Sequence, residues 1–244
     1  MKNNRSRKII SIVLIIIIVF CGLKIFQKYR GYYVDSKNYE NLKTLSPLTD
    51  SALNANPNEN QEDSTHEKNL KNINSDYAFW IKVDGTNIDF PVVQGKDNDF
   101  YLKHDFNKEK SFSGSIFVDY RNDINEDQNL IIYGHNMRND TMFAQMKQFK
   151  NENFFNANKY ITLYRHGVKK QYEIFSIYLT NAKDLKLVPK FSNNEEFYDY
   201  EKEQAEKSIF KRDIEFTPED KIITLVTCGY DFDDARIVVV AKEV

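Results

Sequence analysis

A long apolar run near the N-terminus constrains this chain more than any other feature. Residues 9–23 are apolar except for Ser11, and Ile25-Phe26 continue the run beyond Lys24. A helix crosses a bilayer with about 20 mostly apolar residues, and the run reaches that length when Lys24 extends its ammonium to the interface. The run therefore predicts a membrane span at residues 9–26, and a globular domain has to come from the residues after it.

The flanks of the apolar run predict its orientation. Four basic residues precede it: Lys2, Arg5, Arg7 and Lys8. Basic residues stay on the cytoplasmic side, so residues 1–8 are a cytoplasmic segment and the remainder lies outside the cell. A cleaved signal peptide is the alternative, but its apolar core covers only about 7–15 residues. Residues 27–30 contain no small-x-small cleavage site, which favours an uncleaved, single-pass anchor in the cell membrane.

Residues 27–75 have the composition of a tether. Ser36 is a candidate cap for a short helix that ends before Pro47. Residues 54–71 are almost entirely polar, which is typical of a loosely ordered stretch. Within it, residues 56–60 read Asn-Pro-Asn-Glu-Asn.

From residue 76 to residue 244 the pattern changes to short apolar runs separated by turn residues. The predicted strands are 79–83, 88–93, 115–118, 129–133, 160–164, 171–178, 221–227 and 236–241, with a two-residue Asp84-Gly85 turn after the first. Helical spacing occurs around Met142 to Phe149 and over residues 194–212, the latter just before the last two strands. Many short strands with few helices favour a closed β-barrel or a sandwich.

Composition excludes several classes of function. The chain carries 34 Lys+Arg against 36 Asp+Glu, a net charge of -2, so nucleic acid is not an expected partner. Its two cysteines, Cys21 in the apolar run and Cys228, give no disulfide framework. No His, Cys or carboxylate cluster has metal-ligand spacing, and the acidic runs 122–127 and 231–234 do not match a calcium loop. We therefore expect no cofactor and no metal.

Cys228 is the candidate nucleophile. It ends the strand 222–227 and precedes a loop, a position at which reactive side chains are often presented. The alternative is an inert buried thiol. A nucleophilic thiol needs a base or a cation nearby, so the question becomes which residues can supply them.

His135 and Arg236 are the candidate partners of this cysteine. His135 follows the apolar strand 129–133 directly, in Gly134-His135-Asn136, whereas the other three histidines (His66, His104 and His166) lie in polar segments or turns. Arg236 opens the strand after the Cys228 loop, so a hairpin would bring residues 228 and 236 together. The competing interpretation of Arg236 is a surface ion pair with the neighbouring Asp233 or Asp234.

These residues lie within motifs that resemble those of a known family. Thr224-Leu225-Val226-Thr227-Cys228 resembles the TLxTC signature of sortases, the transpeptidases of Gram-positive cell surfaces. The segments 78–94, 97–102 and 129–137 are similar to recurring motifs of class B sortases. The resemblance covers about residues 77–244, and several motifs in the same order are far more specific than any one of them.

The resemblance implies a fold, a mechanism and partners. The fold is a mainly β, eight-stranded closed sortase barrel with N-terminal helices and a long helix before the last two strands. Cys228 is the nucleophile, His135 the acid/base and Arg236 the stabiliser of the substrate carbonyl oxygen. Asn98, Leu102 and Thr227 are the candidate substrate-binding residues. By this resemblance the enzyme is expected to cleave a Pro-x-Thr type sorting motif after Thr and to transfer the surface protein to a peptidoglycan amine.

Residues 56–60 in the tether resemble such a sorting pentapeptide with Glu in place of Thr. Chance in an Asn-rich spacer is the simpler interpretation.

Two other classes of protein remain open on the residues alone. A secreted cysteine protease would hydrolyse peptides without transfer, although such enzymes usually orient the histidine with a carboxylate or an amide instead of using Arg. A non-catalytic surface-binding protein on the same scaffold would not depend on Cys228. Labelled sorting peptide with and without an amine acceptor separates ligation from cleavage alone. Sensitivity of Cys228 to a thiol-directed reagent, blocked by that peptide, would argue against a non-catalytic binding protein.

Overall fold

The computed structural model describes residues 2–48 and 60–244, so the pentapeptide-like residues 56–59 lie outside it. The helices are α1 (Lys2–Lys43), α3 (Asn60–Ile73), α4 (Glu152–Ala157) and α5 (Asn194–Glu206), with 3-10 turns η1 (Phe100–Leu102) and η2 (Ala144–Lys150). The strands are β1 (Tyr77–Val83), β2 (Asp89–Gln94), β3 (Ile116–Val118), β4 (Asn129–Tyr133), β5 (Tyr160–Arg165), β6 (Val168–Asn181), β7 (Ile222–Cys228) and β8 (Ala235–Glu243).

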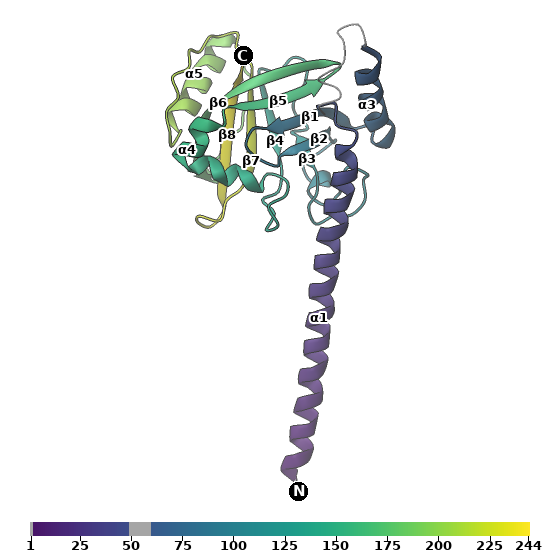
Figure 1. The fold of residues 1–244 in the computed structure, drawn as a ribbon. Helices are drawn as coiled ribbons and strands as arrows, with labels where there is room; N and C mark the ends of the chain where they lie inside the picture. The colour runs from purple at the N-terminus through teal and green to yellow at the C-terminus, as the bar shows by residue number, and fades with distance from the viewer. Residues whose placement is uncertain (1, 49–59) are drawn as a thin grey trace.

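Within the described residues, eight strands close into one barrel in the order β1-β2-β3-β4-β7-β8-β6-β5 (Figure 1). Neighbouring strands are antiparallel except for two parallel pairs, β2 with β3 and β4 with β7. The closed barrel that the sequence predicted is thus confirmed. Its interior is filled by apolar side chains such as Ile81, Ile132 and Leu225, all of them less than 2% exposed, so the barrel is a packed core.

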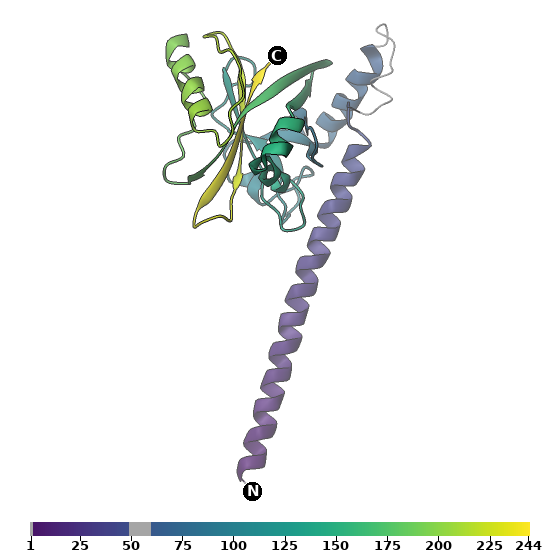
Figure 2. The ribbon, with the colours of Figure 1, turned by 60° about the vertical axis from the view of Figure 1, so that its left-hand side comes forward.

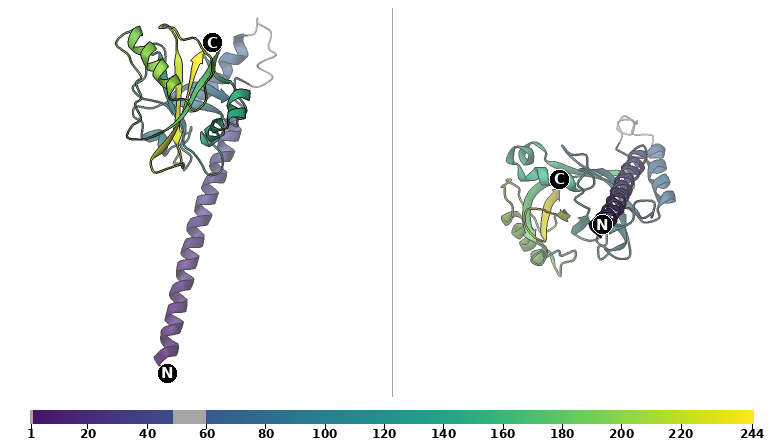
Figure 3. Two further views of the ribbon diagram at one scale, coloured as in Figure 1. Left: turned by 90° about the vertical axis from the view of Figure 1, so that its left-hand side faces the viewer. Right: turned by 90° about the horizontal axis from the view of Figure 1, so that it is seen from below.

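The α1 helix is continuous, which corrects the prediction of a separate short helix beginning near Ser36. The helix contains no proline, and the chain leaves it only four residues before Pro47. Residues 9–26 are exposed throughout, and in the described part of the chain α1 is the one helix long and apolar enough to cross a membrane. Figures 2 and 3 show that α1 passes beside the barrel and extends far beyond it.

The last turns of α1 are attached to the loop between β2 and β3. The Tyr39 hydroxyl donates to the carbonyl oxygen of Gly114 at 2.6 Å, and the Ser111 hydroxyl donates to the Asp35 carboxylate at 2.8 Å. Tyr32 meets Phe112 edge to face, with ring centroids 6.3 Å apart. Because these contacts come from both polar and aromatic groups, the end of α1 belongs to the packed domain rather than to a loose tether.

The polar stretch 54–71 was expected to be loosely ordered, and its described part is helical instead. Residues Asn60–Ile73 form α3. Leu70 on this helix is fully buried in the main core, and the Asn74 side chain, just after the helix, donates to the Tyr101 hydroxyl at 2.9 Å. One buried leucine and one well-bonded asparagine fix a helix whose average composition is polar.

The α5 helix covers the outer face of β6 and β8 (Figure 3). Asn193 caps it by accepting from the Glu196 amide at 2.9 Å, and the helix ends at Glu206 rather than at the predicted residue 212. Phe197 and Tyr200 pack on Phe175 and other outward-facing strand residues, which form a second apolar cluster. Neighbouring strand residues such as Ile174 face the barrel interior, so β6 is buried on both faces.

The β1–β2 connection is longer than the sequence indicated. Residues 84–88 form it, not the two residues Asp84-Gly85 alone. The Val83 amide donates to the Ile88 carbonyl at 3.0 Å, and Gly85 adopts a φ of +69°. The two strands are still an antiparallel pair, so the predicted hairpin is confirmed and only its turn type is wrong.

Candidate active site

The β7–β8 hairpin brings Cys228 and Arg236 together. They are direct cross-strand partners at the end of the ladder, where Gly229 donates to the Ala235 carbonyl at 2.7 Å. Directly paired residues project from the same face of a sheet with their Cβ atoms about 4.5–5.5 Å apart. Cys228 is exposed and Arg236 is half-buried. The thiol is therefore accessible, with a cationic side chain beside it.

His135 reaches the same edge of the barrel from β4. This strand runs parallel to β7 with Tyr133 opposite Val226, and the Gly134 amide donates to the Val226 carbonyl at 3.2 Å. Extending that register by two residues places His135 level with Cys228. Gly134 is required here, because a Cβ atom at this position would lie 2.8 Å from the Phe143 ring. The structure thus brings the three predicted catalytic residues to one end of the barrel.

The imidazole of His135 is oriented by the backbone of η1. Its Nε2 lies 2.8 Å from the carbonyl oxygen of Leu102. A carbonyl oxygen can only accept a hydrogen bond, so Nε2 carries the proton in this contact. Nδ1 is then the nitrogen that can take up or release a proton during a reaction.

Asn136 joins the histidine loop to the cysteine strand, a role that the sequence analysis missed. Its side-chain amide donates to the Cys228 carbonyl at 2.7 Å, and the Tyr230 hydroxyl donates to the Asn136 carbonyl at 2.9 Å. Asn136 is only 8% exposed. The signal in the sequence was a polar residue directly after the strand-end histidine, but its partner lies 92 residues away.

Arg236 has no carboxylate partner among the described residues. Its Nη1 donates to the carbonyl oxygens of Asp234 at 3.2 Å and Ala235 at 2.9 Å. None of the ion pairs in the described part of the chain includes Arg236, and Asp231 in the same loop pairs with Lys150. The surface ion pair considered above is therefore absent from residues 2–48 and 60–244, and the guanidinium retains free N–H groups.

The three candidate substrate-binding residues occupy different environments. Leu102 is half-buried, and its backbone carbonyl oxygen accepts a hydrogen bond from Nε2 of His135. Asn98 is half-buried, and its side-chain oxygen accepts from the Tyr120 amide at 3.0 Å. Thr227 is 3% exposed, and its hydroxyl donates to the Gly134 carbonyl at 2.7 Å. Thr227 therefore braces the strands that carry His135 and Cys228, and it presents no surface to a substrate in this conformation.

Other ionisable groups do not form a metal centre in the part of the chain that the structure describes. No group of three or more His, Cys, Asp or Glu side chains is arranged to hold an ion among those residues. The acidic loop residue Asp231 is engaged by Lys150, and in the other acidic run Asp127 accepts from the Asn122 side chain and the Asp123 amide. The reactive groups that the described residues bring together at this end of the barrel are the Cys228 thiol, the His135 imidazole and the Arg236 guanidinium.

Comparison with known proteins agrees with this geometry. The family model described as a sortase domain matches residues 81–244. Sortase B of Staphylococcus aureus is 35% identical over 246 residues, covering 99% of this chain and 98% of that protein. Sortase B of Listeria monocytogenes is 34% identical over 88% of this chain and 90% of that protein.

Solved structures show the same fold. A mutant form of Clostridium perfringens sortase B is 66% identical, covers 86% of this chain and 98% of that chain, and superposes with a TM-score of 0.82. A sortase B–substrate complex from Staphylococcus aureus is 33% identical over 87% of this chain and 97% of that chain, with a TM-score of 0.76. The chain therefore belongs to the sortase family of cysteine transpeptidases, and its relatives place it among the class B sortases.

Proposed function

We propose that this chain cleaves a Pro-x-Thr type sorting motif after Thr and transfers the surface protein to a peptidoglycan amine, with Cys228, His135 and Arg236 as catalytic residues. One observation carries the proposal: Cys228 and Arg236 are direct partners across the β7–β8 hairpin, and His135 lies level with them on the parallel strand β4. A nucleophile, a proton-transfer group and a cation thus meet at one accessible edge.

The first half-reaction uses each group once. The Cys228 thiolate attacks the carbonyl carbon of the Thr residue in the motif, and the carbonyl oxygen gains negative charge. The free N–H groups of Arg236 stabilise that charge. Nδ1 of His135, protonated at this stage, gives its proton to the departing amine, and the C–N bond breaks. A thioacyl-enzyme and the free C-terminal fragment remain.

The second half-reaction restores the enzyme. The acceptor amine attacks the thioester carbon and loses a proton to Nδ1 of His135, and Cys228 leaves as a thiolate. The product is an amide between the surface protein and the cell wall. Water attacking the same thioester would instead release a carboxylic acid, which is hydrolysis without transfer.

Substrate contacts are assigned from position and from the relatives. Sortase B of Staphylococcus aureus has been solved as a substrate complex, which supports a substrate site on this fold. Asn98 and Leu102 are our candidates for the peptide-binding rim, since Leu102 contacts the catalytic imidazole directly. We assign Thr227 a supporting role beneath the site, because its hydroxyl is bound to Gly134.

The proposed location of the enzyme follows from α1. Residues 1–8 are cytoplasmic, residues 9–26 span the membrane, and residues 76–244 form the extracellular catalytic domain. The exposure of every side chain from residue 9 to residue 26 supports this proposal, because an apolar helix surface without protein contacts is stable in lipid. Residues 27–75 then connect the span to the domain, with helical structure over much of their length.

The test is a peptide assay with and without an amine acceptor. Wild-type enzyme should form the transpeptidation product with the acceptor and the hydrolysed acid without it. Cys228→Ala should abolish both products, whereas Cys21→Ala, a matched change of the other cysteine, should leave both unchanged. Cleavage that never yields a ligated product would favour a protease, and binding of peptide with full activity in Cys228→Ala would exclude Cys228 as the nucleophile.

A further inference from the structure

A cavity lies at the opposite end of the barrel from Cys228. It has a volume of about 290 Å³, near the lower limit of about 300 Å³ for small-molecule sites. Ile222, the first residue of β7, lines it, whereas Cys228 is the last residue of that strand. Six residue steps of about 3.3 Å each, from Ile222 to Cys228, separate the two sites by about 20 Å. The cavity is therefore distinct from the catalytic site.

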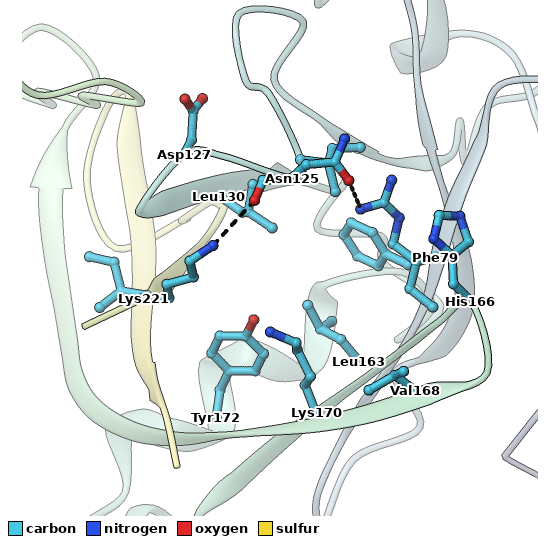
Figure 4. Close-up of a pocket in the computed structure, with 13 residues that line it drawn as sticks. Phe79, Asn125, Asp127, Leu130, Leu163, His166, Val168, Lys170, Tyr172 and Lys221 are labelled. Carbon is cyan, nitrogen blue, oxygen red and sulfur yellow. Dashed lines mark hydrogen bonds between the residues drawn. The ribbon is translucent and has the colours of Figure 1, made fainter. Parts of the chain in front are cut away.

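The floor of this cavity is apolar and its mouth is basic. Phe79, Leu130 and Leu163 line it, and each of them is at most 7% exposed. Figure 4 shows the ammonium of Lys170 and the hydroxyl of Tyr172 directed into the open space. Arg165 and Lys221 complete the lining from β5 and from the residue before β7. An apolar floor with cations at the rim suits a ligand that is apolar at one end and anionic at the other.

Two of these cations are not neutralised. Lys170 pairs with Glu243 at 2.7 Å, but among the described residues neither Arg165 nor Lys221 forms an ion pair. Both bind Asn125 instead: Arg165 Nη1 donates to its side-chain oxygen at 2.8 Å and Lys221 Nζ to its backbone oxygen at 3.2 Å. Two positive charges thus converge on one neutral residue at the mouth.

The guanidinium of Arg165 has an unused donor. Its Nε is shielded from solvent and has no hydrogen-bond partner among the described residues, and leaving a buried donor unpaired costs about 1–3 kcal/mol. Asp127 does not accept a hydrogen bond from this Nε. Figure 4 shows its carboxylate turned away from the cavity, and it accepts from the Asn122 side chain and the Asp123 amide instead. A planar carboxylate matches the edge of a guanidinium that Nε forms.

We propose that this cavity binds a carboxylate carried on a small apolar body, with the carboxylate between Arg165 and Lys221 and the apolar body over Phe79 and Leu163. Such a group occurs in free acylated amino acids and at the C-terminus of a peptide that ends in an apolar residue. The inference is independent of the catalytic assignments, because no residue of the Cys228 end takes part in it.

The test is methyl NMR on the full chain in detergent micelles, with N-acetyl-L-phenylalanine as the probe and its uncharged amide as the control. The acid should shift the Ile222, Leu130 and Leu163 methyl signals while leaving Val226, near the catalytic end, unchanged. The amide should bind at least about tenfold more weakly, since it lacks the charge-assisted bonds. A peptide, acetyl-Gly-Gly-Phe with a free carboxylate, distinguishes the sources: binding assigns the site to peptide C-termini, and failure assigns it to small acids.

Variants locate the carboxylate. Arg165→Gln and Lys221→Gln should each weaken binding of the acid about tenfold, whereas Lys169→Gln, an exposed neighbour on β6 outside the cavity, should not. Two variants are needed so that a folding defect in one leaves the other informative. Equal binding of acid and amide, wild-type affinity in both cavity variants, or tighter binding of phenyl phosphate than of the acid would overturn the proposal.

Discussion

Glu201 provides the sharpest test of how α5 is held on the barrel. This glutamate is fully buried, and neither of its carboxylate oxygens has a hydrogen-bond partner among the described residues. Burial is the main cause that raises its pKa to about 8; nearby Asp220 adds to this shift and Lys242 reduces it. The side chain is therefore mainly protonated in the folded protein at neutral pH.

The pH dependence of stability follows from this pKa. In the unfolded chain the group titrates near 4.5 and in the folded protein near 8. Between these values the folded state holds a proton that the unfolded state has released, so the free energy of unfolding falls as pH rises. The contribution of protonated Glu201 to the free energy of unfolding is complete below pH 4.5 and lost above pH 8. At 1.36 kcal/mol per pH unit the gap gives an upper limit of about 5 kcal/mol, and local undocking of α5 reduces the expected loss to about 2–3 kcal/mol.

Glu201→Gln should remove this pH dependence. The amide is neutral at every pH, so the variant should match wild type near pH 5 and exceed it by about 2–3 kcal/mol at pH 9. Urea unfolding of the full chain in detergent, followed by the fluorescence of the single tryptophan Trp80, measures the difference. Glu206→Gln, an exposed position on the same helix, is the control and should show no such trend. A difference between Glu201→Gln and wild type that stays constant from pH 5 to pH 9 would refute the argument.

The remaining predictions concern the catalytic end. Arg236→Lys should lower kcat/KM for peptide cleavage by about 10²–10³, because a lysine cannot replace a well-aimed oxyanion donor; a loss below about fivefold at matched melting temperature would remove Arg236 from catalysis. Asn136→Ala should lower kcat about tenfold with little change in KM, since it frees the Cys228 carbonyl, and an effect confined to KM would indicate substrate binding instead. Thr227→Val should lower the free energy of unfolding by about 1 kcal/mol through loss of its bond to Gly134, and a large rise in KM at unchanged stability would restore Thr227 as a substrate contact. Activity should persist in excess chelator; loss that calcium reverses would show that a metal takes part.

Local patterns in the chain predicted most of the barrel and the identity of its candidate catalytic residues. The β4 strand has the predicted bounds, 129–133, because an apolar run between turn residues leaves little freedom of register. The proximity of Cys228 and Arg236 was also predictable, since a short loop between two strands makes a hairpin. Sequence alone underestimated the helices: α3 is polar on average, and the buried Leu70, which packs it against the main core, has no local signature in the sequence.

The parallel pairing of β4 with β7 was decided only in the tertiary structure. Its partners, such as Tyr133 and Val226, lie 93 residues apart, so no local pattern encodes which strand closes beside which. That pairing places His135 level with Cys228, lets Asn136 reach the Cys228 carbonyl, and turns Thr227 toward Gly134. The sequence determines which side chains stand at the strand ends, because hydrophobic periodicity and turns are local properties. Which of those ends meet depends on closing the barrel, because the register of a parallel pair is set by packing of the whole core.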